Sequence, residues 1–135
     1  MAQEPCSREE IEELRKIVAR SLADANARGL SPDGVFGFGY NAARALATMV
    51  IRAAGYRVRT SVGGHYNTFL AFGVADDAFS NLADYLDLCR IKRNDFLYEQ
   101  ADVVTESEAQ ELLMKVRQLD LQVNAWIKKY HAALY

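Results

Sequence analysis

Apolar residues recur every three or four positions along most of the chain, and this is the period of an amphipathic helix. The pattern is cleanest in the last part of the chain. There it comprises Ala109, Leu112, Leu113, Val116, Leu119, Val123, Trp126, Ile127 and Tyr130. Thr105 and Glu108 have the spacing of a capping box, in which each side chain bonds the backbone N–H of the other residue. The sequence therefore predicts a helix from Thr105 nearly to the last residue.

A second capping box predicts a helix at the start of the chain. Ser7 and Glu10 have the same spacing, and apolar residues follow with a helical period. They are Ile11, Leu14, Ile17, Val18, Leu22 and Ala25. Gly29 supplies a helix stop, so we expect this helix to cover about residues 7–28.

The next helix starts at Ser31-Pro32, because serine is a common cap and proline suits the first helical position. Gly55 ends it. Within it, GFGYNA at Gly37 to Ala42 matches the G-x-G-x-x-A form of the dinucleotide-binding fingerprint. That fingerprint should follow a strand and precede an acidic residue, and neither condition holds here. We therefore interpret these small residues as a place where two helices pack closely.

The middle of the chain predicts two further helices. Gly63-Gly64 breaks the chain before HYNTFLAFGVA, which we interpret as a buried helix, with a strand as the alternative for so short an apolar run. Asp76 or Asp77 can cap a fourth helix that extends through about residue 101. One of its faces carries Phe79, Leu82, Ala83, Leu86 and Cys89, and another carries Leu88, Ile91 and Tyr98. A helix that is apolar on two sides usually lies between two partners, and the second could be another subunit.

Together these patterns predict an all-α fold: an antiparallel up-and-down bundle of about five helices, in a single domain over residues 1–135. Half of the residues are hydrophobic and a quarter are charged, as in ordinary globular proteins. No run reaches the roughly 18 apolar residues of a membrane span. Cys6 and Cys89 lie far apart without metal-ligand spacing. We therefore expect a cytoplasmic protein with no membrane segment, no metal and no cofactor.

The charge of the chain restricts how it could bind nucleic acid. A formal charge of -2 removes the broad basic surface that dominates non-specific affinity, so any contact with RNA must be local. Arg52, Arg57 and Arg59 form a small basic patch around the turn at Gly55. We expect either a solvated loop there or the first contacts to an RNA backbone.

The second half of the fourth helix, CRIKRNDFLYEQ, carries the candidate chemistry. Arg93 falls within the apolar stripe, where a guanidinium needs an acid, a phosphate or an opening to water. Arg90, Asn94 and Tyr98 follow at spacings of four residues, with Asp87 alongside. One strip of the helix thus offers a cation, an amide and a phenol that could hold a phosphodiester. In the alternative interpretation, both arginines are paired with acids such as Asp87 or a glutamate of the fifth helix, and they only fasten the fold.

Arg93-Asn94 followed by Tyr98 resembles the signature of HEPN domains, in which an arginine and a polar neighbour precede a histidine. The order of helices, the stretch YNAARALATMVIRAAGYR and the turn GGHYNTF are also similar to that family, so the likeness covers residues 7–130. HEPN proteins are small helical bundles, commonly dimers. Many are metal-independent endoribonucleases or toxins encoded beside a nucleotidyltransferase-type antitoxin. The resemblance implies that Arg93 and Asn94 hold the phosphate and that Tyr98 takes the place of the histidine, in a cleft between two subunits.

Tyr98 departs from the family pattern. Histidine exchanges protons near neutral pH, whereas an unperturbed tyrosine has a pKa of about 10 and is a poor general base. His65 follows two glycines at the start of a predicted helix and could replace the missing base. A histidine that only caps or packs against that helix is the commoner case.

The sequence leaves three hypotheses for function. The one we favour, because of Tyr98, is a degenerate HEPN module that binds RNA, a nucleotide or a partner protein in a toxin–antitoxin or defence context. The second is a weakly active, metal-independent endoribonuclease. The third is a purely structural helical homodimer. In a dimer, Leu88, Ile91 and Tyr98 would contribute to the interface, because they lie off the main apolar stripe.

Overall fold

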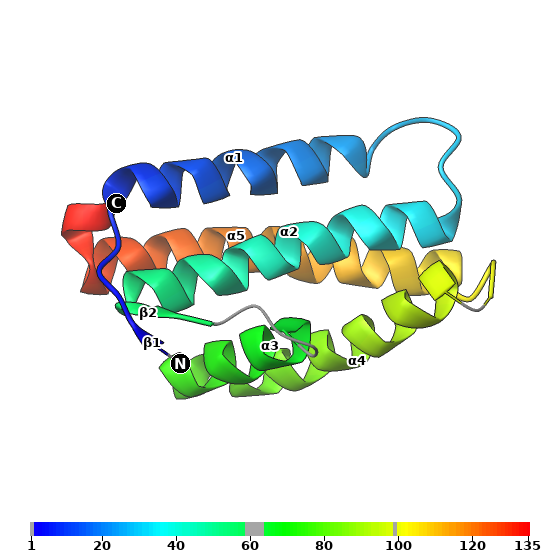
Figure 1. Cartoon of the computed structure of the whole chain (residues 1–135). Helices are drawn as coiled ribbons and strands as arrows, with labels where there is room; N and C mark the ends of the chain where they lie inside the picture. The colour runs from blue at the N-terminus through cyan, green and yellow to red at the C-terminus, as the bar shows by residue number, and fades with distance from the viewer. Residues whose placement is uncertain (1, 59–63, 99) are drawn as a thin grey trace.

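The structure is a computed structural model that describes residues 2–58, 64–98 and 100–135, with the side chains of all of these except 64–67 and 96–98. The described residues form five α-helices and a very small sheet, which confirms the predicted all-α bundle (Figure 1). The helices are α1 (Arg8–Asp24), α2 (Pro32–Ala53), α3 (Gly64–Ala75), α4 (Ser80–Tyr98) and α5 (Glu106–Tyr130). Two 3₁₀ turns accompany them, η1 (Asp77–Phe79) and η2 (Ala132–Leu134).

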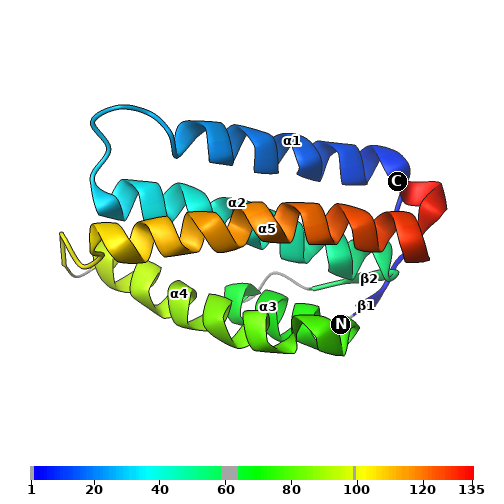
Figure 2. The same cartoon turned by 180° about the vertical axis from the view of Figure 1, so that it is seen from behind.

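Helix α2 lies at the centre of the bundle. The other four helices all pack against it, with α1 along one side and α3 and α4 along the other (Figures 1 and 2). Thirteen of its 22 residues are buried, and Tyr40, Leu46 and Met49 are among the most deeply buried side chains of the core. The site described below is therefore built on a helix whose position is fixed from several directions.

Local signals set the starts of α1, α2 and α5 as predicted. The Ser7 hydroxyl accepts a hydrogen bond from the Glu10 backbone N–H at 3.2 Å. At α5, both bonds of the capping box form: the Glu108 N–H donates to the Thr105 hydroxyl at 3.1 Å, and the Thr105 N–H donates to the Glu108 carboxylate at 3.0 Å. The Ser31 hydroxyl accepts from the backbone of the first turn of α2. These caps satisfy N–H groups that have no partner inside the helix.

Some boundaries differ from the prediction. Helix α1 ends at Asp24 rather than near residue 28, because the backbone then tightens into three-residue turns before Gly29 reverses the chain with a φ of +83°. Asp76 caps the 3₁₀ turn η1 through the Ala78 N–H at 2.9 Å, and α4 ends at Tyr98 rather than near residue 101. The apolar run after Gly64 is the predicted helix α3 and not the alternative strand.

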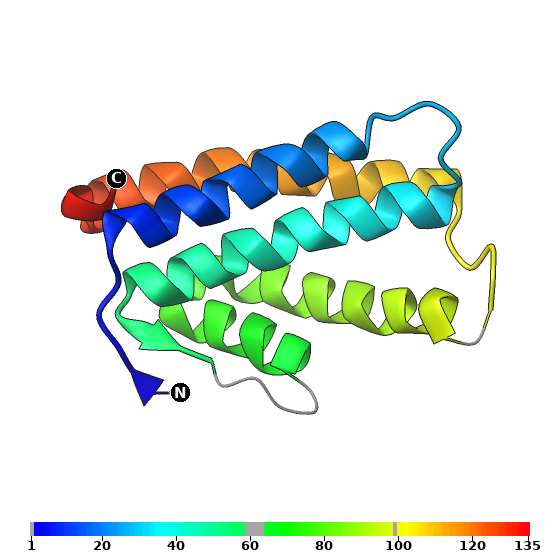
Figure 3. The ribbon, with the colours of Figure 1, turned by 45° about the horizontal axis from the view of Figure 1, so that its top comes forward.

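A two-stranded antiparallel sheet, which the sequence pattern did not predict, ties the beginning of the chain to the end of α2. Strand β1 (Ala2–Gln3) pairs with β2 (Tyr56–Arg57), as Figure 3 shows beside the end of α2. The Glu4 N–H extends the pairing by donating to the Gly55 carbonyl at 2.8 Å. Among the described residues, no helix is both long and apolar enough to cross a lipid bilayer.

Candidate functional site

Arg90 and Asp87, which the sequence placed in the candidate strip, are paired with each other. The Arg90 Nε donates to the Asp87 Oδ1 at 2.8 Å, one turn back on α4, and both side chains are partly buried. This pair corresponds to the alternative interpretation, in which the arginine is fastened to an acid. The positive charge of Arg90 is thereby partly offset.

Arg93 has a different environment. Its Cζ lies 4.9 Å from the ring centroid of Tyr40 on α2, and the side chain is partly exposed. Among the described residues, no carboxylate forms an ion pair with Arg93. A cation over an aromatic ring is stabilised by roughly 0.5–2 kcal/mol, depending on how far it is desolvated. The ring is the partner that an arginine in an apolar stripe requires.

Positive charge gathers around Tyr40. Its side chain is fully buried, and burial raises the pKa of the phenol to about 12. The nearby charges of Arg93, Arg44 and Arg90 act on that pKa in the opposite direction, so all three arginines lie within electrostatic reach of the ring. We call Tyr40, Arg44, Arg90 and Arg93 the Tyr40 cluster. With Asp87 included, three positive charges and one negative charge leave +2 in a chain whose net charge is -2.

This arrangement suits an anion. A guanidinium that lies on a ring keeps its N–H groups in its own plane, where they can form paired hydrogen bonds to a phosphate or a carboxylate. Arg44 is exposed one turn after Tyr40 on α2, and its charge acts on the same ring from a second helix. The sequence did not single out Tyr40 or Arg44 as site residues. Both lie in the stretch YNAARALATMVIRAAGYR, in which the sequence indicated no site role for either residue.

The remaining predicted site residues are only partly placed. Asn94 follows Arg93 on α4 and is partly exposed. Tyr98 is the last residue of α4, and His65 lies in the first turn of α3. The side chains of Tyr98 and His65 lie outside the described residues, so their roles stay predictions. Within the described part of the chain, no three His, Cys, Asp or Glu side chains gather as a metal site would require.

Around Gly55, the structure has an ion-pair network centred on the buried Arg52. Arg52 is 1% exposed, and its Nε and Nη2 donate to the two oxygens of Glu10 at 2.9 and 3.0 Å. Its Nη1 donates to the backbone carbonyls of Glu4 and Tyr56 at 2.9 and 2.7 Å, and its Nη2 also donates to the Pro5 carbonyl at 2.7 Å. Arg52 therefore joins the first residues of the chain, α1, α2 and β2, and it is not available to RNA.

Arg57 shares the acids of this network. It forms ion pairs with Glu4 and with Glu10, the latter at 2.6 Å, although its own side chain is 47% exposed. The hydrogen bond from Arg52, together with Arg57, lowers the pKa of Glu10 to about 2. Arg59, the third member of the predicted patch, lies outside the described residues. We call Glu4, Glu10, Arg52 and Arg57 the Arg52 network.

Gly39 of the GFGYNA motif serves close helix packing, as predicted. Gly39 faces α5, and a Cβ added to it would lie 3.3 Å from Leu113 Cδ2 and 3.4 Å from Leu112 side-chain atoms. This close approach of α2 to α5 fills the space that a nucleotide phosphate would need. The motif lies inside α2, after that helix has already begun.

Comparisons of the chain with family models, with curated proteins and with solved structures give no match.

Proposed function

We propose that the chain is a HEPN-like domain with a degenerate ribonuclease motif, and that its Tyr40 cluster binds the phosphate of an RNA or a nucleotide. The supporting observation is the placement of Arg93. It lies over Tyr40, is partly exposed and has no ion-pair partner in the described part of the chain. A guanidinium already oriented by a ring loses little freedom when it binds a phosphate. The proposed setting is a cytoplasmic toxin–antitoxin or defence system.

The binding test compares two arginine variants with the same change of charge. Labelled single-stranded RNA is titrated with wild type, Arg93→Ala and Arg20→Ala, where Arg20 is an exposed residue of α1. We expect Arg93→Ala to weaken binding about tenfold or more and to lower the dependence of log K on log salt by about 1, because one phosphate contact is lost. Arg20→Ala should bind nearly as wild type. Equal losses of RNA affinity in the two variants would show that Arg93 is not part of the binding site.

Turnover is a separate question, because Tyr98 stands where the family has histidine. If the site is a decayed ribonuclease, Tyr98→His should raise cleavage of RNA in the presence of a chelator. A well-placed general base contributes about 10²- to 10⁴-fold in rate. Cleavage by wild type that depends on Arg93 would instead favour the second hypothesis, a weakly active endoribonuclease. Binding without cleavage in every variant supports the degenerate module.

Association with other chains is also proposed. Leu88 and Ile91 are 67% and 46% exposed on α4, as an interface between two copies would require before assembly. Sedimentation at micromolar concentration tests the homodimer, and a monomer there would count against it. A nucleotidyltransferase-type antitoxin encoded in the neighbouring gene would support the proposed setting. A stable dimer with no RNA or nucleotide binding would favour the third hypothesis, a purely structural homodimer.

A further inference from the structure

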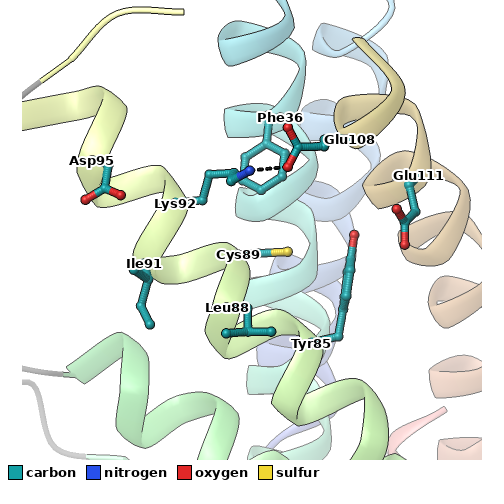
Figure 4. Close-up of a pocket in the computed structure, with 9 residues that line it drawn as sticks. All are labelled: Phe36, Tyr85, Leu88, Cys89, Ile91, Lys92, Asp95, Glu108 and Glu111. Atoms are coloured by element: carbon teal, nitrogen blue, oxygen red, sulfur yellow. Dashed lines mark hydrogen bonds and ion pairs between the residues drawn. The ribbon is translucent and has the colours of Figure 1, made fainter. Parts of the chain in front are cut away.

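Helices α4 and α5 border a groove with an aromatic floor. Each packs against α2 more closely than the two approach one another, and between them lies a cavity of about 380 Å³. Phe36 of α2 forms the floor, Leu88 lines the α4 side, and the ring of Tyr85 on α4 points toward Glu111 of α5 (Figure 4). We call this the α4–α5 groove. It shares no lining residue with the Tyr40 cluster.

The apolar part of the groove extends to the surface. Leu88, which lines it, is 67% exposed, and Ile91 one turn further is 46% exposed. Below them lie the buried ring of Phe36 and the buried thiol of Cys89. A partner's apolar side chain can be buried in this cavity, because the floor is aromatic and the rim carries exposed leucine and isoleucine side chains.

The charges of the groove are mostly negative. Lys92 is the one cation among the described lining residues and Asp95, Glu108 and Glu111 are the acids, so their formal charge is +1 and -3, or -2. Lys115, which lies over the ring of the lining residue Tyr85, brings the total to -1. The charge of Lys92 is already paired, because Lys92 forms an ion pair with Glu108 that crosses in front of Phe36 (Figure 4). Asp95 and Glu111 form no ion pair within the described part of the chain. Two carboxylates thus remain available to a cation.

The aromatic wall already holds a cation. The Lys115 Nζ lies 4.9 Å from the ring centroid of Tyr85. Burial raises the pKa of the Tyr85 phenol, and the charge of the nearby Glu111 adds to the rise, so this carboxylate lies within reach of the ring. The wall that faces Glu111 is therefore suited to positive groups.

We propose that the α4–α5 groove binds a basic amphipathic helix of a partner protein. An apolar side chain of that helix enters over Phe36 beside Leu88, and its lysine or arginine side chains pair with Glu111 and Asp95. The lining argues against a second copy of the chain at this place. Two copies joined groove to groove would set like carboxylates against each other, which electrostatic complementarity disfavours. Ile91 also lines the groove, so a dimer formed through Leu88 and Ile91 would compete with the partner helix for this face.

The test uses a labelled amphipathic helical peptide of leucine and lysine, with a leucine–glutamate peptide of the same pattern as the charge control. Both are titrated with the whole chain by fluorescence anisotropy. Leu88→Ser and Glu111→Gln probe the groove. The matched controls are Leu121→Ser, a leucine 75% exposed elsewhere on α5, and Glu9→Gln on α1.

We expect the leucine–lysine peptide to bind to the wild-type chain. It should bind about tenfold more weakly to Leu88→Ser, because the peptide then no longer buries the leucine side chain at position 88. Glu111→Gln should weaken binding a few-fold and reduce its salt dependence. The two controls and Arg93→Ala should bind as wild type, so that the result does not depend on the proposed phosphate site.

Several outcomes would overturn the proposal. Absence of binding up to about 1 mM peptide is one, since such weak affinity marks no specific site. Equal binding of the leucine–glutamate peptide is another, and equal losses from Leu121→Ser and Leu88→Ser are a third. A fourth is a dimer in sedimentation that Leu88→Ser dissociates and that the peptide does not disrupt. In that case a second copy of the chain occupies the groove.

Discussion

Replacing Arg52 by methionine should lower the free energy of unfolding by about 3 kcal/mol, a large part of the roughly 5–15 kcal/mol of a typical domain. Methionine is apolar and unbranched, so it can fill much of the space that the arginine stem occupies. It cannot donate hydrogen bonds. The substitution therefore isolates what the guanidinium contributes to the fold.

The magnitude follows from the five hydrogen bonds of Arg52. Three backbone carbonyls, those of Glu4, Pro5 and Tyr56, lose their donor, and Glu10 loses its buried partner. Removing one member of a buried ion pair typically costs about 3–5 kcal/mol. We expect the loss for Arg52→Met to lie at the lower end of that range, because the Glu10 side chain is 29% exposed and keeps its ion pair with Arg57 at 2.6 Å.

Arg57→Met is the matched control, because Arg57 contacts from the surface the carboxylates of Glu4 and Glu10, to which Arg52 is also paired at 3.4 and 2.9 Å. An exposed pair contributes about 0–1 kcal/mol. Urea unfolding, followed by the helical circular dichroism signal, gives the free energy of unfolding of both variants. Unchanged m-values show that unfolding exposes the same amount of surface in each. If the two variants lose equal stability, or if Arg52→Met loses less than about 1 kcal/mol, burial of the network is not what stabilises the fold.

Two further predictions concern the same network and the packing of α2. The pKa of Glu10 is lowered from 4.5 to about 2, so its contribution to stability should be complete above pH 4.5 and should be lost as the pH falls toward 2. Thermal unfolding across that range should show a flatter profile for Glu10→Gln than for wild type, and parallel profiles would contradict the prediction. Gly39→Ala should stay within about 1 kcal/mol of wild type, because better helix propensity offsets a tight contact. Gly39→Leu should lose about 2 kcal/mol or more in urea unfolding, since Leu112 and Leu113 leave no room for a longer side chain.

The helices could be predicted because their signals are local. Ser7 with Glu10 and Thr105 with Glu108 lie three residues apart, and each pair forms hydrogen bonds in the structure. The end of α1 was predicted less well. Gly29 does reverse the chain, but the turns before it depend on weak backbone preferences that the apolar period does not record.

The partners of the arginines could not be predicted in the same way. Glu10 precedes Arg52 by 42 residues, so no spacing rule connects them, and the same arginine looked like part of an exposed basic patch. Likewise, Tyr40 and Arg93 lie on different helices and meet only when α4 packs on α2. Sequence periodicity placed Arg93 in an apolar stripe and so showed that a partner was needed. The identity of that partner is a property of the tertiary fold.

The central position of α2 also bears on how this protein can change during evolution. Substitutions on two outer helices that do not touch each other should have additive effects, so these helices can diverge separately. A substitution on α2 must remain compatible with α1, α3, α4 and α5 together. Its buried positions are accordingly rich in alanine, the smallest side chain that favours a helix. They include Ala42, Ala43, Ala45 and Ala47, which lie on more than one side of the helix. In distant homologues, we therefore expect α2 to diverge least and the outer faces of the other helices to diverge most.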